Sequence, residues 1–188
     1  MYRLVLKMFP AAIFVAVLFA GSIWVAGYVA ENDLAQDLVE QFGYLGVFLL
    51  AIIGGFNLVV PFPAAALSPI FLSTDLSVVG IIFTLALGTT LADSISYAVG
   101  ILGRKHWEIE EHPYFLKFKT FRDKHEKWTI PILLLYASFV PYPNEILTLP
   151  LGFLGVRFRT LMPALLLGNL LHNTLLIVGI TSLLSLLS

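Results

Sequence analysis

Two ionisable side chains, Asp93 and Glu145, stand inside long apolar stretches of the chain. A charged group at membrane depth costs several kcal/mol unless it is paired or hydrated, so such residues are candidates for an ion, proton or substrate site. Other polar side chains recur nearby at spacings of three or four residues, which place them along one face of a helix. The candidates for lining a transport or substrate groove are Asp93, Tyr97, Asn144, Glu145, Asn169, His172 and Asn173.

Structural roles for the same residues stay open. Glu145 lies two residues after Pro143, so its carboxylate is suited to stabilising the amino-terminal end of its own helix. Asp93 could instead pair with His172 or with a tyrosine hydroxyl as a link between helices. A lone histidine in apolar sequence is more often a hydrogen-bonded interior residue than a ligand, so we predict no metal site.

Catalytic motifs are missing from the chain. His125-Glu126 is not followed by the second histidine of a zinc protease, and neither a Gly-x-Ser-x-Gly elbow nor a phosphate-binding glycine loop occurs. The chain contains no cysteine, which excludes disulfides, thiolate metal sites and cysteine nucleophiles. We therefore predict that the protein is not an enzyme and has no cofactor.

Composition indicates a single integral membrane domain over residues 1–188. Hydrophobic residues make up 59% of the chain, charged residues 12%, and the mean hydropathy is +0.91. A net charge of -1 does not suggest a nucleic-acid partner. The apolar run within residues 1–30 is longer than a usual signal-peptide core and lacks a clear cleavage site, so we expect a retained transmembrane helix there.

The chain repeats itself with an offset of 80 residues, as Val60-Pro61-Phe62-Pro63 and Val140-Pro141-Tyr142-Pro143 make clearest. Proline ends one helix and suits the first position of the next, so Pro63 and Pro143 should each begin a helix. The pieces after the breaks are short, and about 10 residues of helix span only about 15 Å. We therefore expect two re-entrant hairpins with Pro61, Pro63, Pro141 and Pro143 at their tips; tight turns between ordinary helices, or two short crossings for each hairpin, are the alternatives.

Charge asymmetry predicts the topology. Basic residues gather at 3–7, 104–127 and 157–159, whereas the loops that carry residues 31–40 and Asp75 contain only acidic charges. Lysine and arginine in short loops mark the cytoplasmic side, so we expect the amino terminus inside and the carboxyl terminus outside. The repeats at 42–103 and 130–187 are then inverted, and each consists of a re-entrant hairpin followed by a transmembrane helix. Such repeats bring their hairpin tips together near the bilayer midplane, as in transporters.

The stretch 104–129 is the one sizeable polar segment, yet it contains an aromatic series at helical spacing. The series comprises Phe115, Phe118, Phe121, His125 and Trp128. Because lysines surround it, we predict an amphipathic helix on the cytoplasmic membrane face, in contact with anionic lipids. A solvated connector that happens to contain aromatic residues is the alternative.

The run from Leu87 to Gly100, followed by Gly103-Arg104, resembles the Gly-Asp, Tyr and Gly-Arg pattern of the DedA or VTT (SNARE-associated) membrane proteins. The resemblance continues through Phe121 to Trp128, the break at Phe139-Val140-Pro141, Gly152 and Gly168-Asn169. It implies facing re-entrant hairpins and lipid translocation, by scrambling in eukaryotic members and by polyprenyl-phosphate flipping or ion-coupled transport in bacterial ones.

The chain departs from that pattern at both breaks. Many bacterial members carry acidic residues around the first break and arginines around the second, where this chain has Gly54, Gly55 and Ala64 in the first and Ser138 and Asn144 in the second. Arginine supplies the bidentate fork that phosphate recognition favours, so a phosphate clamp is not carried over. A zwitterionic or cationic group, a proton or a sodium ion would suit Glu145 better.

We expect a divergent family member that moves a lipid or lipid headgroup across the bilayer, with membrane lipids as its partners. The expected location is a prokaryotic cytoplasmic membrane, and a homo-oligomer is left open. One alternative is a proton- or cation-coupled exporter of a small amphipathic solute, in which Asp93 and Glu145 carry the coupling ion. A second alternative is a membrane scaffold without transport, which would tolerate Glu145→Gln and Asp93→Asn.

Overall fold

The computed structural model describes residues 33–56, 64–104, 113–140 and 143–187, and every regular element in these ranges is helical. The helices are α2 (Asp33–Phe42), α3 (Tyr44–Gly55), the 3-10 turn η1 (Ala64–Leu67), α4 (Ser68–Leu72), α5 (Val78–Arg104), α6 (Pro113–Lys124), α7 (Glu126–Phe139), α8 (Glu145–Phe153) and α9 (Phe158–Leu187). The predicted helix within residues 1–30 and the tip residues Pro61, Pro63 and Pro141 lie outside the described residues.

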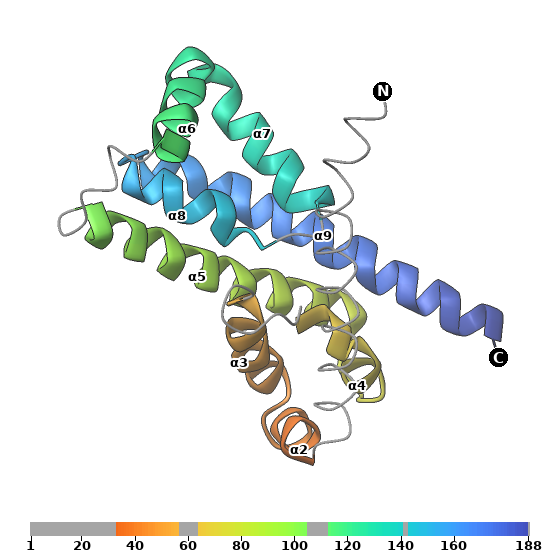
Figure 1. The fold of residues 1–188 in the computed structure, drawn as a ribbon. Coiled ribbons are helices and arrows are strands. Elements are labelled where there is room, and N and C mark those ends of the chain that lie inside the picture. Colours follow the sequence, from red (N-terminus) through yellow and green to blue (C-terminus); the bar gives the residue numbers. More distant parts are fainter. Residues whose placement is uncertain (1–32, 57–63, 105–112, 141–142, 188) are drawn as a thin grey trace.

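Two long apolar helices form the frame of the molecule. α5 has 27 residues and α9 has 30, so each is at least about 40 Å long at 1.5 Å per residue and exceeds the roughly 30 Å hydrocarbon layer. Both are apolar enough to cross a membrane. They pack side by side and run in opposite directions (Figure 1).

Large apolar side chains are exposed on the outside of the molecule, and several polar side chains are buried within it. On α5 the side chains of Phe83, Leu87, Leu91 and Ile95 are exposed at intervals of four residues, which form one continuous face of the helix. In the part of the chain that the structure describes, nine polar or charged residues are buried, Asp93 among them. An apolar exterior, together with polar groups buried in a largely apolar interior, agrees with the membrane location that the composition predicts.

Shorter helices flank this frame in two groups. α3 packs against α5, α7 packs against α9, and α8 packs against α5 on the side opposite α3 (Figure 1). Within the first group the end of α3 touches the start of η1, since a Cβ on Gly54 would lie 2.9 Å from that of Ala64. In the second group α7 and α8 form the two arms of a V (Figure 1).

Three details differ from the sequence-based expectation. Pro143 does not occupy the first helical position, because α8 begins at Glu145 with Asn144 as its cap residue. The acidic segment expected as a loop is the helix α2, which buries one side on the core through Ala35 and Val39. Residues 126–129, expected in the connector, belong to α7, the helix that leads to the second proline break.

The predicted single helix over 104–129 is also wrong for the described part of that segment. α6 ends at Lys124 and α7 begins at Glu126, so His125 separates two helices. A periodicity of 3.6 residues continues across such a break in the sequence, but the two helices then turn their faces in different directions. The aromatic series is also divided between an inner and an outer surface: Phe115 and Phe118 of α6 pack inward, whereas Phe121 at the end of α6 and Trp128 on α7 are exposed.

Glycine allows the same close packing in both halves. A Cβ on Gly88 would lie 2.5 Å from the Cβ of Ala51 and 2.9 Å from the carbonyl oxygen of Phe48. A Cβ on Gly168 would lie 2.5 Å from the Cβ of Ala137, with a carbonyl oxygen three residues earlier at 3.3 Å. Gly88 and Gly168 are 80 residues apart, so α5 meets α3 in the way that α9 meets α7.

We predict that Gly88→Ala and Gly168→Ala each lower the melting temperature of the detergent-solubilised protein, measured by intrinsic tryptophan fluorescence. Forcing a methyl group into these contacts separates the helices and costs about 1 to 3 kcal/mol. Gly179→Ala is the matched control, because nothing lies within 4 Å of its Cβ position. Equal melting temperatures for all three variants would contradict this packing.

Candidate functional site

The carboxylate of Asp93 is buried at the centre of the molecule. Only 2% of the residue is exposed, yet it sits midway along α5, whose outer face is apolar. Its Oδ2 accepts one hydrogen bond from Asn144 Nδ2 (2.9 Å) and one from Asn169 Nδ2 (2.8 Å). Charge-assisted hydrogen bonds of this kind are the strong ones, and they offset part of the cost of burying the group.

The two asparagines also bind each other, so the cluster is a closed network. Asn144 Nδ2 donates to Asn169 Oδ1 (2.9 Å), and Asn169 Nδ2 donates to Thr90 Oγ1 (3.0 Å). Each side-chain amide has two N–H groups, and both amides donate twice here. The network joins three elements: α5 through Asp93 and Thr90, the start of α8 through Asn144, and α9 through Asn169.

The side chain of Asn144 makes an unusual set of hydrogen bonds for a helix-cap residue. Asparagine at this position ordinarily bonds to the amides of its own first turn, but this side chain makes no capping bond. Its amide reaches instead to the two long helices. The break before α8 is therefore anchored to α5 and α9 by one side chain.

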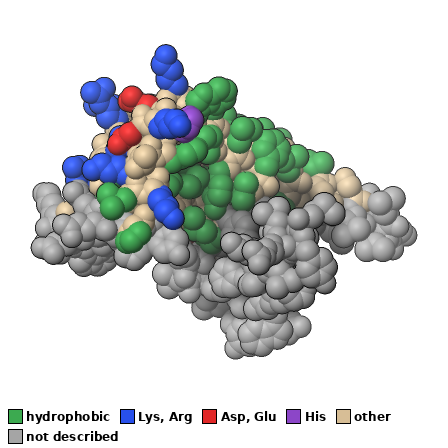
Figure 2. Space-filling view, turned by 45° about the horizontal axis from the view of Figure 1, so that its top comes forward, with side chains coloured by type: hydrophobic (Ala, Val, Ile, Leu, Met, Phe, Trp, Pro, Cys, Tyr) green, Lys and Arg blue, Asp and Glu red, His purple; other side chains and the backbone are tan. Residues whose placement is uncertain are grey.

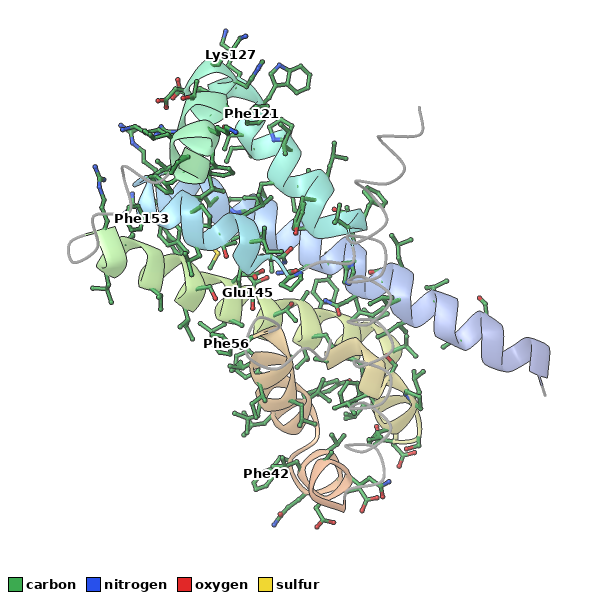
Figure 3. The ribbon with its side chains drawn as sticks, in the orientation of Figure 1. Phe42, Phe56, Phe121, Lys127, Glu145 and Phe153 are labelled. Atoms are coloured by element: carbon green, nitrogen blue, oxygen red, sulfur yellow. The ribbon has the colours of Figure 1, made fainter. Side chains whose placement is uncertain are left out.

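Glu145 adds a second buried carboxyl beside the network. It is 2% exposed, and it directly follows Asn144, which donates to Asp93. Figure 3 shows it at the start of α8, on the side that faces α5. One turn later on the same face of α8, the hydroxyl of Thr148 is buried and has no hydrogen-bond partner among the described residues.

The other predicted residues of α9 occupy the surroundings of the network. Asn173 is buried and donates to the main-chain oxygen of Asn169 (2.8 Å), within its own helix. His172 Nδ1–H donates to the carbonyl oxygen of Ser138 (3.3 Å) at the end of α7. His172 therefore links α9 to α7, and Asp93 is paired with amides instead of with this histidine.

Tyr97 serves a different part of the molecule. Its hydroxyl donates to the carbonyl oxygen of Val156, between α8 and α9, and its ring packs against Phe158 at a centroid distance of 5.4 Å. Tyr97 also belongs to an apolar cluster with residues of α7, α8 and α9. It joins α5 to the far end of α8, and the network described above lies at the near end.

Three contributors to the site and its surroundings were not among the predicted site residues. Thr90 accepts a bond from Asn169, and its position one turn before Asp93 was the available signal. The carbonyl oxygen of Ser138 holds His172, and no side-chain pattern could reveal a main-chain contact. Tyr136 also holds the break, since its hydroxyl donates to the carbonyl oxygen of Pro143 (3.3 Å).

No lysine or arginine accompanies the two carboxyls among the residues that the structure describes. The described basic residues lie at the end of α5, in α6, at the start of α7, and between α8 and the first turn of α9. The site is therefore rich in carboxyl and amide groups. Such a set favours a proton, a metal cation of low charge or an ammonium group over a bare phosphate.

Comparison with known proteins is decisive at the family level. A family model for the VTT domain matches residues 70–182. The chain belongs to the VTT domain family. The match confirms the resemblance to the DedA and SNARE-associated proteins, and the VTT region contains the whole network from Thr90 to Asn173. A search of curated proteins and of solved structures finds no significant match.

The family and the two long apolar helices identify this VTT protein as a membrane protein. The matched residues begin within α4, so α2, α3 and the first break precede the match. Asp93, Asn144 and Asn169 all lie inside it. The polar network is thus part of the VTT domain itself.

We predict that Asn169→Ala destabilises the protein by about 1 to 3 kcal/mol. The substitution removes two donated hydrogen bonds and leaves the buried carboxylate of Asp93 without one of its donors. Thermal unfolding in detergent measures the effect. Thr174→Ala is the control on the same helix, since that hydroxyl bonds only to the carbonyl oxygen of Leu170. If Asn169→Ala melts no lower than Thr174→Ala, the network does not hold the three helices together.

Proposed function

We propose that this VTT protein moves a lipid, or the polar headgroup of a lipid, across the bilayer between two facing re-entrant hairpins. The observation that best supports this proposal is the hydrogen-bond network of Asp93, Asn144 and Asn169, which is a buried polar site at a helix break in a membrane protein. A headgroup crossing the apolar layer needs such a polar path. Polar groups at this depth are otherwise costly.

The lengths of the broken helices support re-entry. α7 has 14 residues and α8 has 9, which correspond to about 21 Å and 14 Å, well short of the roughly 30 Å hydrocarbon layer. α3, with 12 residues, is equally short. A pair of such arms enters the membrane and returns to the same side.

An inverted repeat is supported by two features of the packing. The glycine contacts of Gly88 and Gly168 match across the two halves, and α5 and α9 run in opposite directions (Figure 1). Under this proposal α3 and α7 are the first arms of the two facing hairpins. The basic end of the molecule would lie in the cytoplasm, with the amino terminus inside and the carboxyl terminus outside a prokaryotic cytoplasmic membrane.

Transport requires the network to open. Asp93 is 2% exposed in this conformation and Asn144 bonds to both long helices. A passing headgroup must therefore replace the bonds of Asn144 with bonds of its own, and the start of α8 must move away from α5. Asn144 would act as the closing contact, and the two carboxyls would receive the cationic part of a zwitterionic headgroup.

A coupled exporter of a small amphipathic solute is the second candidate, and the burial of both Asp93 and Glu145 favours it. Two ionised carboxylates in an apolar environment repel each other, so a proton or a sodium ion between them lowers the free energy of the site. An ion held there would couple its own movement to that of the substrate. Passive lipid exchange needs no bound coupling ion.

The test is exchange of a fluorescent phospholipid between the leaflets of proteoliposomes at several pH values. We predict fast exchange with the native protein and at least about tenfold slower exchange with Glu145→Gln, the change that follows from losing about 1.4 kcal/mol of stabilisation of the crossing headgroup. Glu126→Gln is the control, because it makes the same chemical change at an exposed residue at the start of α7.

Exchange at the rate of protein-free vesicles at every pH would overturn lipid translocation. Equal rates for native protein and Glu145→Gln would remove Glu145 from the path. An imposed pH or sodium gradient separates the two candidates: it drives net movement in one direction only if transport is coupled. Native rates in both Glu145→Gln and Asp93→Asn would remove both carboxyls from the path.

A further inference from the structure

The corner between α6 and α7 combines exposed aromatic side chains with positive charge. Phe121 is 51% exposed and Trp128 is 63% exposed. Residues 117–128 contain five basic side chains against two acidic ones, a net charge of +3. Figure 2 shows lysine and arginine side chains gathered at one end of the molecule next to apolar ones, and Figure 3 places Phe121 and Lys127 together at this corner.

These exposed rings are separate from the aromatic residues that hold α6 to the molecule. Phe115 packs edge-on against Phe153, with ring centroids 4.8 Å apart, and Phe118 packs against an apolar cluster of the core. Phe121 contacts only His125 among the ring pairs of the described residues, at 4.9 Å. The inner rings account for the fold, so the outer pair is available to an external partner.

An apolar row on α7 runs from this corner along the helix. Its members, all exposed, are Trp128, Ile132, Leu135 and Phe139. Their spacing of three and four residues keeps them on one face, and in a membrane protein such a face contacts lipid tails. Trp128 stands at the end of the row, beside the exposed Lys127, and the exposed Lys124 ends the neighbouring helix α6 four residues earlier.

This order of side chains matches the boundary of a bilayer. Tryptophan collects at the level of the headgroups, and lysine extends its charged end beyond that level. The row on α7 therefore fixes the depth of the corner, because Trp128 ends the tail-facing surface and the lysines begin the polar one. A soluble acidic protein would match the charge but would leave the row on α7 unexplained.

We propose that the α6–α7 corner binds the headgroups of anionic phospholipids, with Phe121 and Trp128 in the interface and Lys124 and Lys127 on the phosphates. Arg122 contributes less, since its Nε lies 3.0 Å from a carboxylate oxygen of Asp123. This lipid site is at the membrane surface and is distinct from the buried network at Asp93. The proposed surface site does not depend on which substrate the protein translocates.

The test uses the full-length chain in nanodiscs and reads the fluorescence of Trp128. Trp24→Phe and Trp107→Phe leave Trp128 as the only tryptophan of the three in the chain; the difference between native protein and Trp128→Phe gives the same signal by subtraction. Brominated phosphatidylglycerol at low mole fraction should quench Trp128 more strongly than brominated phosphatidylcholine at the same fraction. Lys124→Gln with Lys127→Gln should reduce that preference by about fivefold per lysine, the factor that corresponds to about 1 kcal/mol each.

Arg159→Gln is the matched control, because it removes one exposed positive charge at the start of α9, outside the corner. We expect the preference for phosphatidylglycerol to survive it. Equal quenching by the two lipids would overturn the proposal, and so would an equal effect of Arg159→Gln and the lysine variants. Quenching by aqueous acrylamide but by neither lipid would place the corner in water and indicate a soluble partner.

Discussion

The burial of one carboxylate, Asp93, is the constraint on which the rest of the structure depends. A carboxyl group with an apolar exterior around it needs donors, and its own helix cannot supply them because the backbone amides of α5 are already paired. The donors come from Asn169 on α9 and from Asn144 at the start of α8. These bonds fix the rotation of α9 against α5 and the place at which α8 begins, so they decide the geometry of the break as well as the chemistry of the site.

The packing of the remaining helices follows from that arrangement. Small residues let α3 approach α5 and let α7 approach α9, with the same contacts at Gly88 and Gly168. Because hydrophobic burial provides little force between helices in lipid, close van der Waals contact and hydrogen bonds must hold them. The molecule therefore places glycine and alanine where helices cross, polar groups where three elements meet, and large apolar side chains on the outside.

Much of this arrangement could be predicted from the sequence, because intramembrane polar residues are rare. Asn169 and Asn173 lie on one face of their helix, and Asp93 stands 80 residues before Asn173, which is the offset of the sequence repeat. Both observations indicated that the two long helices share one polar site. The partners of each atom could not be predicted: Asn144 could have capped its own helix, and Tyr97 lies on the same helix as Asp93 yet bonds to Val156. Such choices depend on helix rotation, which the spacing does not specify. The prediction of one continuous helix from the aromatic series was wrong for a related reason, because a periodic pattern does not show that the helix is interrupted at His125.

Transport by the proposed route requires that the network around Asp93 become accessible to water or to lipid headgroups, although apolar side chains surround it. The chain has no cysteine, so a single introduced thiol reports its own surroundings in proteoliposomes. Thr90→Cys lies in the network, whereas Leu91→Cys, one residue away at the same depth, faces outward from α5. Because the thiolate is the reactive form and needs a polar environment, a water-soluble thiosulfonate reagent should modify Thr90→Cys and leave Leu91→Cys unmodified. Equal modification of both, or none at Thr90→Cys, would contradict a polar path through this site.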